Sequence, residues 1–280
     1  MGADPADSQT MLDLLRCAHI GPCVAVTLIA SALALAGGRG GGTVWVAAAV
    51  FAGQLSIGWA NDWLDEDRDR AAGRSDKPVV TGAVAARTLR TAALVALGAC
   101  AVLSLASGPA AAAVHLLAVG FGWAYDLGLK RTAASVVPYL AAFGLLPAFV
   151  ALGLEAGRLP PWWIVVGGGL LGAAAHFTNA IPDLEVDART GVRGLPQRLG
   201  AGRSLAASAV LLAVAGAVVL AGPDGRPGPA RAVSVAVGAV LVGGVVAAGL
   251  ADRPRAAFRL TMGAALAVTA ALVAGGDRLG

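Results

Sequence analysis

Charged residues are scarce in this chain of 280 residues: Asp, Glu, Lys and Arg together make up 14% of it, against about 25% in an average soluble domain. Cysteine is scarce too. The three cysteines lie in apolar stretches, at a spacing that fits no zinc-binding pattern, so we interpret them as packing residues. There is no low-complexity tail and no polar stretch long enough for a separate soluble domain. We therefore expect a single domain over residues 1–280.

Hydrophobic residues, by contrast, make up 57% of the chain, and the mean hydropathy is +0.74. A helix that crosses a bilayer needs about 20 apolar residues, and the many Gly and Ala residues allow helices to approach closely in lipid. We predict an all-α, polytopic membrane protein, a bundle of nine transmembrane helices. The nine apolar runs cover residues 14–36, 43–61, 88–107, 109–127, 133–154, 161–181, 204–221, 229–250 and 257–274.

The distribution of Lys and Arg predicts the orientation in the membrane. With a cytoplasmic N-terminus, 16 of the 21 basic residues fall on the cytoplasmic side, as the positive-inside rule requires. The N-terminus is acidic and lacks the basic segment of a cleaved signal peptide, so we expect the first run to be retained. The net charge of +4 reflects this topology, so the lipid bilayer is the expected partner and no nucleic acid is needed to explain it.

A dense acidic cluster directly follows the second apolar run. Five carboxylates lie between Asp62 and Asp69, immediately after Asn61. Asp62, Asp65 and Asp69 have the i, i+3, i+7 spacing that places side chains on one face of a helix. A carboxylate at the end of a membrane helix is costly and usually functional.

A second, sparser cluster follows the sixth run. Asn179, Asp183 and Asp187 have the i, i+4, i+8 spacing, again one helical face. A solvated loop would explain Glu66 and Asp67, but it would not explain this one-face spacing twice. If the two clusters face each other, Mg²⁺ would offset their charge, since it binds a few carboxylates, water and phosphate oxygens. We predict a divalent-metal site with a phosphorylated ligand, exposed to the cytoplasm.

Basic residues flank both clusters. Part of them only sets the orientation, but Lys77 lies in a constrained loop before Pro78, and Tyr125 places a phenol near Lys130. Such groups can bind the outer oxygens of a diphosphate. The candidates for this role are Arg74, Lys77, Lys130, Arg131 and Arg193.

These motifs together resemble those of a known family. The Asn-Asp-x-x-Asp-x-x-x-Asp pattern that begins at Asn61 resembles the first signature of the UbiA-type intramembrane prenyltransferases, and the Asp-x-x-x-Asp pattern that begins at Asp183 resembles the second. Tyr125 followed by Lys130 resembles the tyrosine–lysine element of the family, and residues 191–200 resemble its basic tail. The resemblance spans nearly the whole chain, and nine helices is the number found in the family.

The resemblance implies transfer of a prenyl group from an isoprenyl diphosphate to a small or lipophilic acceptor, with Mg²⁺, two ions by expectation, as the cofactor. The C–O bond would ionise to an allylic carbocation and release diphosphate. Tyr125 and the five aspartates are the implied catalytic residues, and His176 and Asn179 would support the site. The implied metal ligands are Asn61, Asp62, Asp65, Asp69, Asp183 and Asp187.

Three positions depart from the family pattern, and three other functions compete with prenyl transfer. Lys77 stands where the family has Arg, Gly194 stands where it has Thr, and Pro182 stands where family members often have Arg or Lys. A membrane terpene cyclase of the same superfamily would use the same site without an acceptor. A cation or proton transporter fits less well, because the acids lie at helix ends and no broken helix pair is evident. A phosphatidyltransferase would need an Asp-Gly-x-x-Ala-Arg element, which the sequence lacks.

Overall fold

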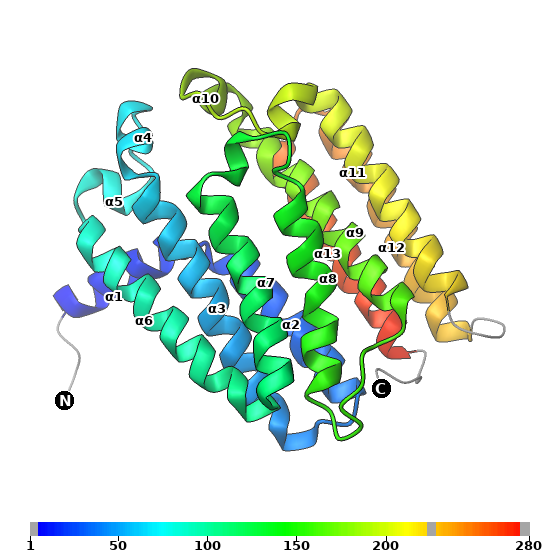
Figure 1. Ribbon diagram of the computed structural model, residues 1–280. Helices are drawn as coiled ribbons and strands as arrows, with labels where there is room; N and C mark the ends of the chain where they lie inside the picture. The colour runs from blue at the N-terminus through cyan, green and yellow to red at the C-terminus, as the bar shows by residue number, and fades with distance from the viewer. Residues whose placement is uncertain (1–4, 223–227, 275–280) are drawn as a thin grey trace.

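The computed structural model describes residues 5–222 and 228–274, which form a bundle of helices with no strand among them (Figure 1). The predicted all-α class is therefore confirmed. The longer helices are α1 (Pro5–Cys17), α2 (Ile20–Ala36), α3 (Thr43–Leu64), α6 (Ala86–Ser104), α7 (Pro109–Leu127), α8 (Val137–Leu152), α9 (Trp162–Ala180), α11 (Leu195–Ala221), α12 (Pro229–Leu250) and α13 (Pro254–Ala274). The short elements are η1 (Gly40–Gly42), α4 (Glu66–Ala71), α5 (Pro78–Thr81), η2 (Leu105–Ser107), η3 (Leu129–Arg131), η4 (Ile181–Asp183) and α10 (Leu184–Arg189).

Several of these helices can cross a membrane. Within the described residues, six stretches are long and apolar enough to do so, and α1 with α2 would add a seventh if this bent pair is one span. Each of the nine apolar runs overlaps one of the longer helices from α2 to α13. The polytopic membrane character is thus confirmed, whereas the number of nine spans stays a prediction.

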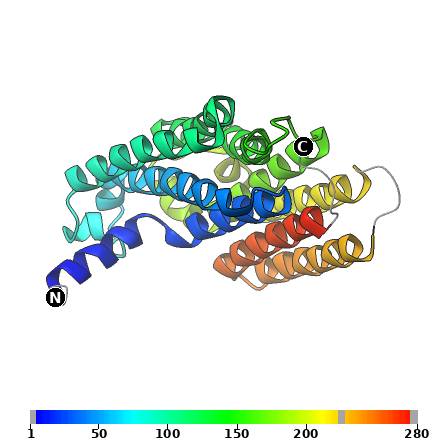
Figure 2. The ribbon, with the colours of Figure 1, turned by 90° about the horizontal axis from the view of Figure 1, so that it is seen from below.

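The first apolar run is not one continuous helix, contrary to the expectation. The chain bends by 69° between α1 and α2, and His19 takes a left-handed conformation with φ 52°, which is uncommon for a residue other than glycine. α3 packs so closely here that a side chain at Gly58 would collide with the carbonyl group of Ala18. Figure 2 shows α1 diverging from the direction of α2 at this bend. The bend places the His19 ring 3.2 Å from the Asp62 carboxylate.

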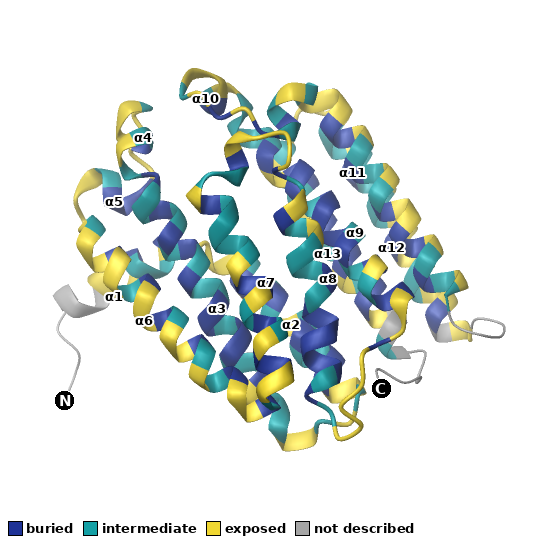
Figure 3. Ribbon diagram, in the orientation of Figure 1, coloured by how far each residue is buried: buried dark blue, intermediate teal, exposed yellow. Residues whose placement is uncertain are grey.

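The helices pack in a closed circuit. α2 contacts α3, α3 contacts α7, α7 contacts α8, α8 contacts α9, α9 contacts α13, and α13 returns to α2. α6 packs mainly on α3, while α11 and α12 lie beside α9 and α13. Exposed residues line the outer helices, as Figure 3 shows for α6 and α12, and many are large and apolar, such as Val102 and Val240. Such faces suit contact with lipid.

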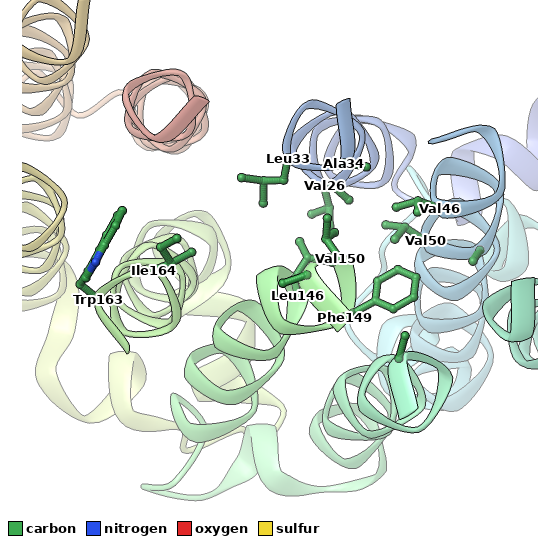
Figure 4. Close-up of a cluster of buried hydrophobic side chains, with 14 residues drawn as sticks. Val26, Leu33, Ala34, Val46, Val50, Leu146, Phe149, Val150, Trp163 and Ile164 are labelled. Carbon is green, nitrogen blue, oxygen red and sulfur yellow. The ribbon is translucent and has the colours of Figure 1, made fainter. Parts of the chain in front are cut away.

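A tightly packed apolar cluster closes one end of this circuit (Figure 4). It joins the C-terminal parts of α2 and α8 to the N-terminal parts of α3, α7 and α9. Lipid is as apolar as these side chains, so close van der Waals packing holds them together. The short helices α4, α5 and α10 lie at the opposite end of the bundle (Figure 1). The residues of the apolar cluster that Figure 4 labels are Val26, Leu33, Ala34, Val46, Val50, Leu146, Phe149, Val150, Trp163 and Ile164.

Candidate active site

The three aspartates of the first motif converge at the polar end of the bundle. α3 ends at Leu64, and Asp65 links it to α4. The helical hydrogen bonding continues across the link, because the Asp69 amide donates to the Asp65 carbonyl at 2.8 Å. All three side chains are therefore turned to the inner side, with Asp62 and Asp65 each 1% exposed and Asp69 fully buried.

Lys77 joins two of these carboxylates. Its ammonium lies 2.8 Å from Asp62 Oδ1 and 2.7 Å from Asp69 Oδ2. Burial alone would lower the pKa of Lys77, but the two carboxylates outweigh it and raise the pKa above its usual value, so the side chain stays charged. Lys77 has the extended backbone (φ −98°, ψ 123°) that a residue before proline favours. The Lys77-Pro78 sequence thus fixes this cation in place.

Lys130 occupies the other side of the acidic cluster. It is buried, and its ammonium lies 2.6 Å from Asp65 Oδ2 and 3.8 Å from Asp126 Oδ1. Asp126 is also buried and accepts a hydrogen bond of 2.8 Å from the Asn61 amide. Asp126 is not among the residues predicted from the sequence, although its position four residues before Lys130 was a usable signal.

Arg68 is a second residue of the site that was not predicted from the sequence. Its guanidinium lies 2.8 Å from Asp65, 3.1 Å from Asp69 and 3.7 Å from Asp187. It therefore connects the first acidic motif to the second. Its i+3 relation to Asp65 was a usable signal for one of these contacts, but with five carboxylates nearby the sequence offered no means of choosing the other partners.

The second motif is not one helical face, contrary to the expectation. Pro182 has no amide hydrogen to continue the α9 hydrogen bonding, and the chain passes through η4 into α10. Asp187 is buried near Arg68 and accepts a hydrogen bond of 2.7 Å from Gln197. Asp183 is half-exposed and pairs with Arg74 at 3.1 Å. The motif still supplies one buried carboxylate and one at the surface.

An aromatic group lies beside the acidic cluster, on α7, α8 and α9. The Tyr125 ring contacts the rings of Tyr139 at 5.2 Å and His176 at 5.6 Å, both edge to face. His176 is buried and pairs with the Ser135 hydroxyl at 3.0 Å, and that oxygen also accepts the Leu195 amide hydrogen. His176 therefore ties the basic tail to the aromatic group. Asn179 is exposed and hydrogen-bonds to Tyr139.

Arg131 and Arg193 are exposed beside the site, and their role in diphosphate binding stays a prediction. The chain between them packs tightly. A Cβ atom on Gly194 would lie 2.6 Å from both the Lys130 carbonyl oxygen and Gln197 Oε1, closer than real side chains approach. Glycine at this position, where the family pattern has Thr, lets the basic tail lie directly against the Lys130 loop.

The donor set fits Mg²⁺, which prefers carboxylate oxygens. In the part of the chain that the structure describes, Asp65 Oδ1 and Asp126 Oδ2 are buried without a hydrogen-bond partner. Over the same residues, no three His, Cys, Asp or Glu side chains are grouped closely enough to hold an ion, because basic side chains stand between the carboxylates. Movement of one of these cations toward an anionic ligand would free carboxylate oxygens for a metal.

Comparison with solved structures supports the fold. A UbiA homologue from Aeropyrum pernix K1 superposes with a TM-score of 0.74 at 24% identity, covering 91% of this chain and 98% of that one. An Archaeoglobus fulgidus homologue solved with geranyl diphosphate (GPP) and Mg²⁺ gives 0.65 at 19% identity, covering 94% and 98%. These likenesses confirm that the bundle has the fold of UbiA homologues.

Comparison of sequences identifies the family. A lycopene elongase/hydratase from Halobacterium salinarum is 38% identical over 74 residues, and the match spans 26% of this chain and about a quarter, 27%, of that protein. The family model described as the UbiA prenyltransferase family matches residues 23–267, which include both acidic motifs and all the basic residues around them. The chain belongs to the UbiA prenyltransferase family.

Proposed function

We propose that this protein transfers a prenyl group from an isoprenyl diphosphate to a small or lipophilic acceptor, with Mg²⁺ as cofactor. The observation that carries the proposal is the buried arrangement of Asp62, Asp65, Asp69 and Asp187 with Lys77, Lys130 and Arg68. Carboxylates suited to Mg²⁺ and cations suited to phosphate oxygens alternate within one site. Family membership supports the same conclusion, as do the Archaeoglobus fulgidus homologue structures with DMAPP or GPP and Mg²⁺.

The metal would be held by Asp62, Asp65, Asp69 and Asp187, with Asn61 and the half-exposed Asp183 at the edge of the set. Bound there, Mg²⁺ would offset the charge that grows on the leaving diphosphate. The number of carboxylates in the two motifs is suited to two Mg²⁺ ions.

The basic residues would bind the diphosphate and stabilise it as it leaves. Lys77 and Lys130 are buried against carboxylates and remain in place without solvent reorganisation, which is the condition for strong electrostatic stabilisation. As the C–O bond breaks, its electron pair leaves with the diphosphate, and these ammonium groups face the developing charge. Arg74, Arg131 and Arg193 lie farther out and would guide the anion to the site.

The aromatic group beside the acids would shelter the allylic cation from water. The faces of Tyr125, Tyr139 and Phe143 supply π-electron density, which attracts a cation, and His176 keeps two of these rings in place. The acceptor then attacks the cation, a carbon–acceptor bond forms, and the acceptor loses a proton. The isoprenoid chain would extend among the apolar helices, and the site would face the cytoplasm.

The need for an acceptor distinguishes prenyl transfer from the reaction of a membrane terpene cyclase, in which the cation would cyclise without an acceptor. To distinguish the two reactions, purified protein in liposomes is incubated with Mg²⁺, prenyl diphosphates of several lengths and a lipid extract. The products are then identified by mass spectrometry. A prenylated acceptor that forms only when the extract is present supports transfer. A terpene hydrocarbon or alcohol formed equally well without the extract would contradict it and favour the cyclase.

A further inference from the structure

Arg68 holds a special place among the basic residues of the site. Among the ion pairs of the described residues, it is the side chain that joins Asp65 and Asp69 of the first motif to Asp187 of the second. Its guanidinium thus lies between the two acidic motifs, in the space that separates the oxygens of one from those of the other. The Arg68 guanidinium therefore lies where a metal ion shared by the two motifs would bind.

The charges show what this placement does. The buried carboxylates around this space outnumber the cations: three cations, Lys77, Lys130 and Arg68, face Asp62, Asp65, Asp69, Asp126 and Asp187. The cations offset part of the negative charge, and a Mg²⁺ ion that binds between the two motifs would have to displace Arg68. Without Arg68 the same groups would carry one more uncompensated negative charge, which favours binding of a divalent ion.

Arg68 is also the cation best able to leave. Its side chain is 17% exposed, against 9% for Lys77 and 4% for Lys130. Its contact with Asp187 is long at 3.7 Å, and its Nε is buried without a hydrogen-bond partner among the described residues. Guanidinium groups bind phosphate through two parallel hydrogen bonds, so an arriving diphosphate offers Arg68 a better partner.

We propose that Arg68 is an internal counter-ion that keeps free Mg²⁺ out of the site until a diphosphate arrives. The diphosphate draws the guanidinium away from Asp65, Asp69 and Asp187, and the freed oxygens then hold the metal that the diphosphate brings. Metal and diphosphate therefore bind with positive coupling, and each raises the affinity for the other by the same factor. This inference rests on the proposed function only in placing a divalent metal at the acidic motifs.

The test measures metal binding directly, with no turnover. Mn²⁺ binding to the purified protein in nanodiscs is followed by electron paramagnetic resonance, with and without inorganic pyrophosphate, and with free Mn²⁺ corrected for its pyrophosphate complex. The wild type should bind Mn²⁺ weakly alone and much more tightly with pyrophosphate. Arg68→Gln should bind Mn²⁺ alone about ten- to hundredfold more tightly, the equivalent of the charge-assisted contacts that Arg68 occupies, and should gain less from pyrophosphate.

Matched variants separate this effect from a general change of charge. Arg70→Gln removes an arginine from the same short helix, but one that pairs with Glu66 away from the cluster, and should behave as the wild type does. Arg68→Lys keeps the charge and should keep metal binding weak. Arg68→Met is a second neutral variant that retains the aliphatic stem, should Arg68→Gln fold poorly, and the same tightening is expected.

One result would overturn the inference: a folded neutral variant at Arg68 that binds Mn²⁺ no more tightly than the wild type and Arg70→Gln. Failure of the proposed function is a separate result. If the protein forms no prenylated product but shows the expected Mn²⁺ binding, the counter-ion role of Arg68 is supported and the proposed reaction is contradicted. If it forms product but does not show the expected Mn²⁺ binding, the reaction is supported and the counter-ion role is contradicted.

Discussion

Asp69→Asn, compared with Glu66→Gln, tests whether the buried carboxylates form the site. Both positions lie on α4, and both substitutions remove one charge with almost no change in shape. Asp69 is fully buried between Lys77 at 2.7 Å and Arg68 at 3.1 Å. Glu66 pairs at 2.6 Å with Arg70, which is exposed on the outer side of the helix.

The structure sets the expected size of the difference. In Asp69→Asn one oxygen remains, so one charge-assisted hydrogen bond is lost, at about 1.5–3 kcal/mol, and the other is weakened by about 1 kcal/mol. The total of about 2.5–4 kcal/mol corresponds to a fall of about 10²–10³-fold in kcat/KM. An exposed pair such as Glu66–Arg70 is worth about 0–1 kcal/mol, so Glu66→Gln should lower kcat/KM by at most about fivefold.

The assay is Mg²⁺-dependent release of diphosphate by protein in liposomes, from whichever of several prenyl diphosphates the wild type uses best. Circular dichroism and gel filtration establish that both variants are folded. An equal loss of activity in the two folded variants would refute the reasoning, since position relative to the buried cluster would then have no effect.

Three further predictions concern the buried lysines, the packing at Gly194 and the membrane topology. Lys77→Ala and Lys130→Ala should weaken binding of a non-hydrolysable prenyl diphosphate analogue by about ten- to hundredfold. Arg203→Ala and Arg255→Ala, which remove basic residues that our prediction assigns to membrane orientation alone, should not weaken it, and equal effects in all four variants would contradict the assignment of the two lysines to the site. Gly194→Thr should destabilise the protein by about 1–3 kcal/mol through overpacking against Lys130, seen as a lower unfolding temperature, and an unchanged temperature would contradict the close approach. Reporter fusions should find the N-terminus in the cytoplasm and the C-terminus on the other side, and a cytoplasmic C-terminus would show that the number of spans is not nine.

Much of the site could be predicted from the sequence, because the site residues of the first motif and of the Lys77-Pro78 loop are close together in the chain. Asp62, Asp65 and Asp69 are brought to one side by continued helical hydrogen bonding, and a period of 3.6 residues suffices to predict it. The restrained backbone before Pro78 likewise follows from local chemistry alone and fixes Lys77.

The remaining features depend on packing between distant segments. The break at His19 coincides with the close approach of Gly58 to Ala18, and Gly21-Pro22 in the first turn of α2 was a local signal for it that the prediction of one continuous helix did not use. The pairing of Arg68 with Asp187 and of Asn61 with Asp126 depends on how α4, α10 and α7 meet. In a stretch with five carboxylates and several arginines, spacing alone cannot choose the partners.

The most direct test of the account is whether diphosphate release depends on both the metal and the two acidic motifs. Purified protein in liposomes is given the prenyl diphosphate that the wild type uses best and a lipid extract. Released diphosphate is measured with Mg²⁺ or with EDTA, in the wild type, Asp69→Asn and Asp187→Asn. We expect release with Mg²⁺ and none with EDTA, and a rate about 10²-fold or more lower in both variants than in the wild type. Release that persists in EDTA, or in either folded variant at the wild-type rate, would contradict the account.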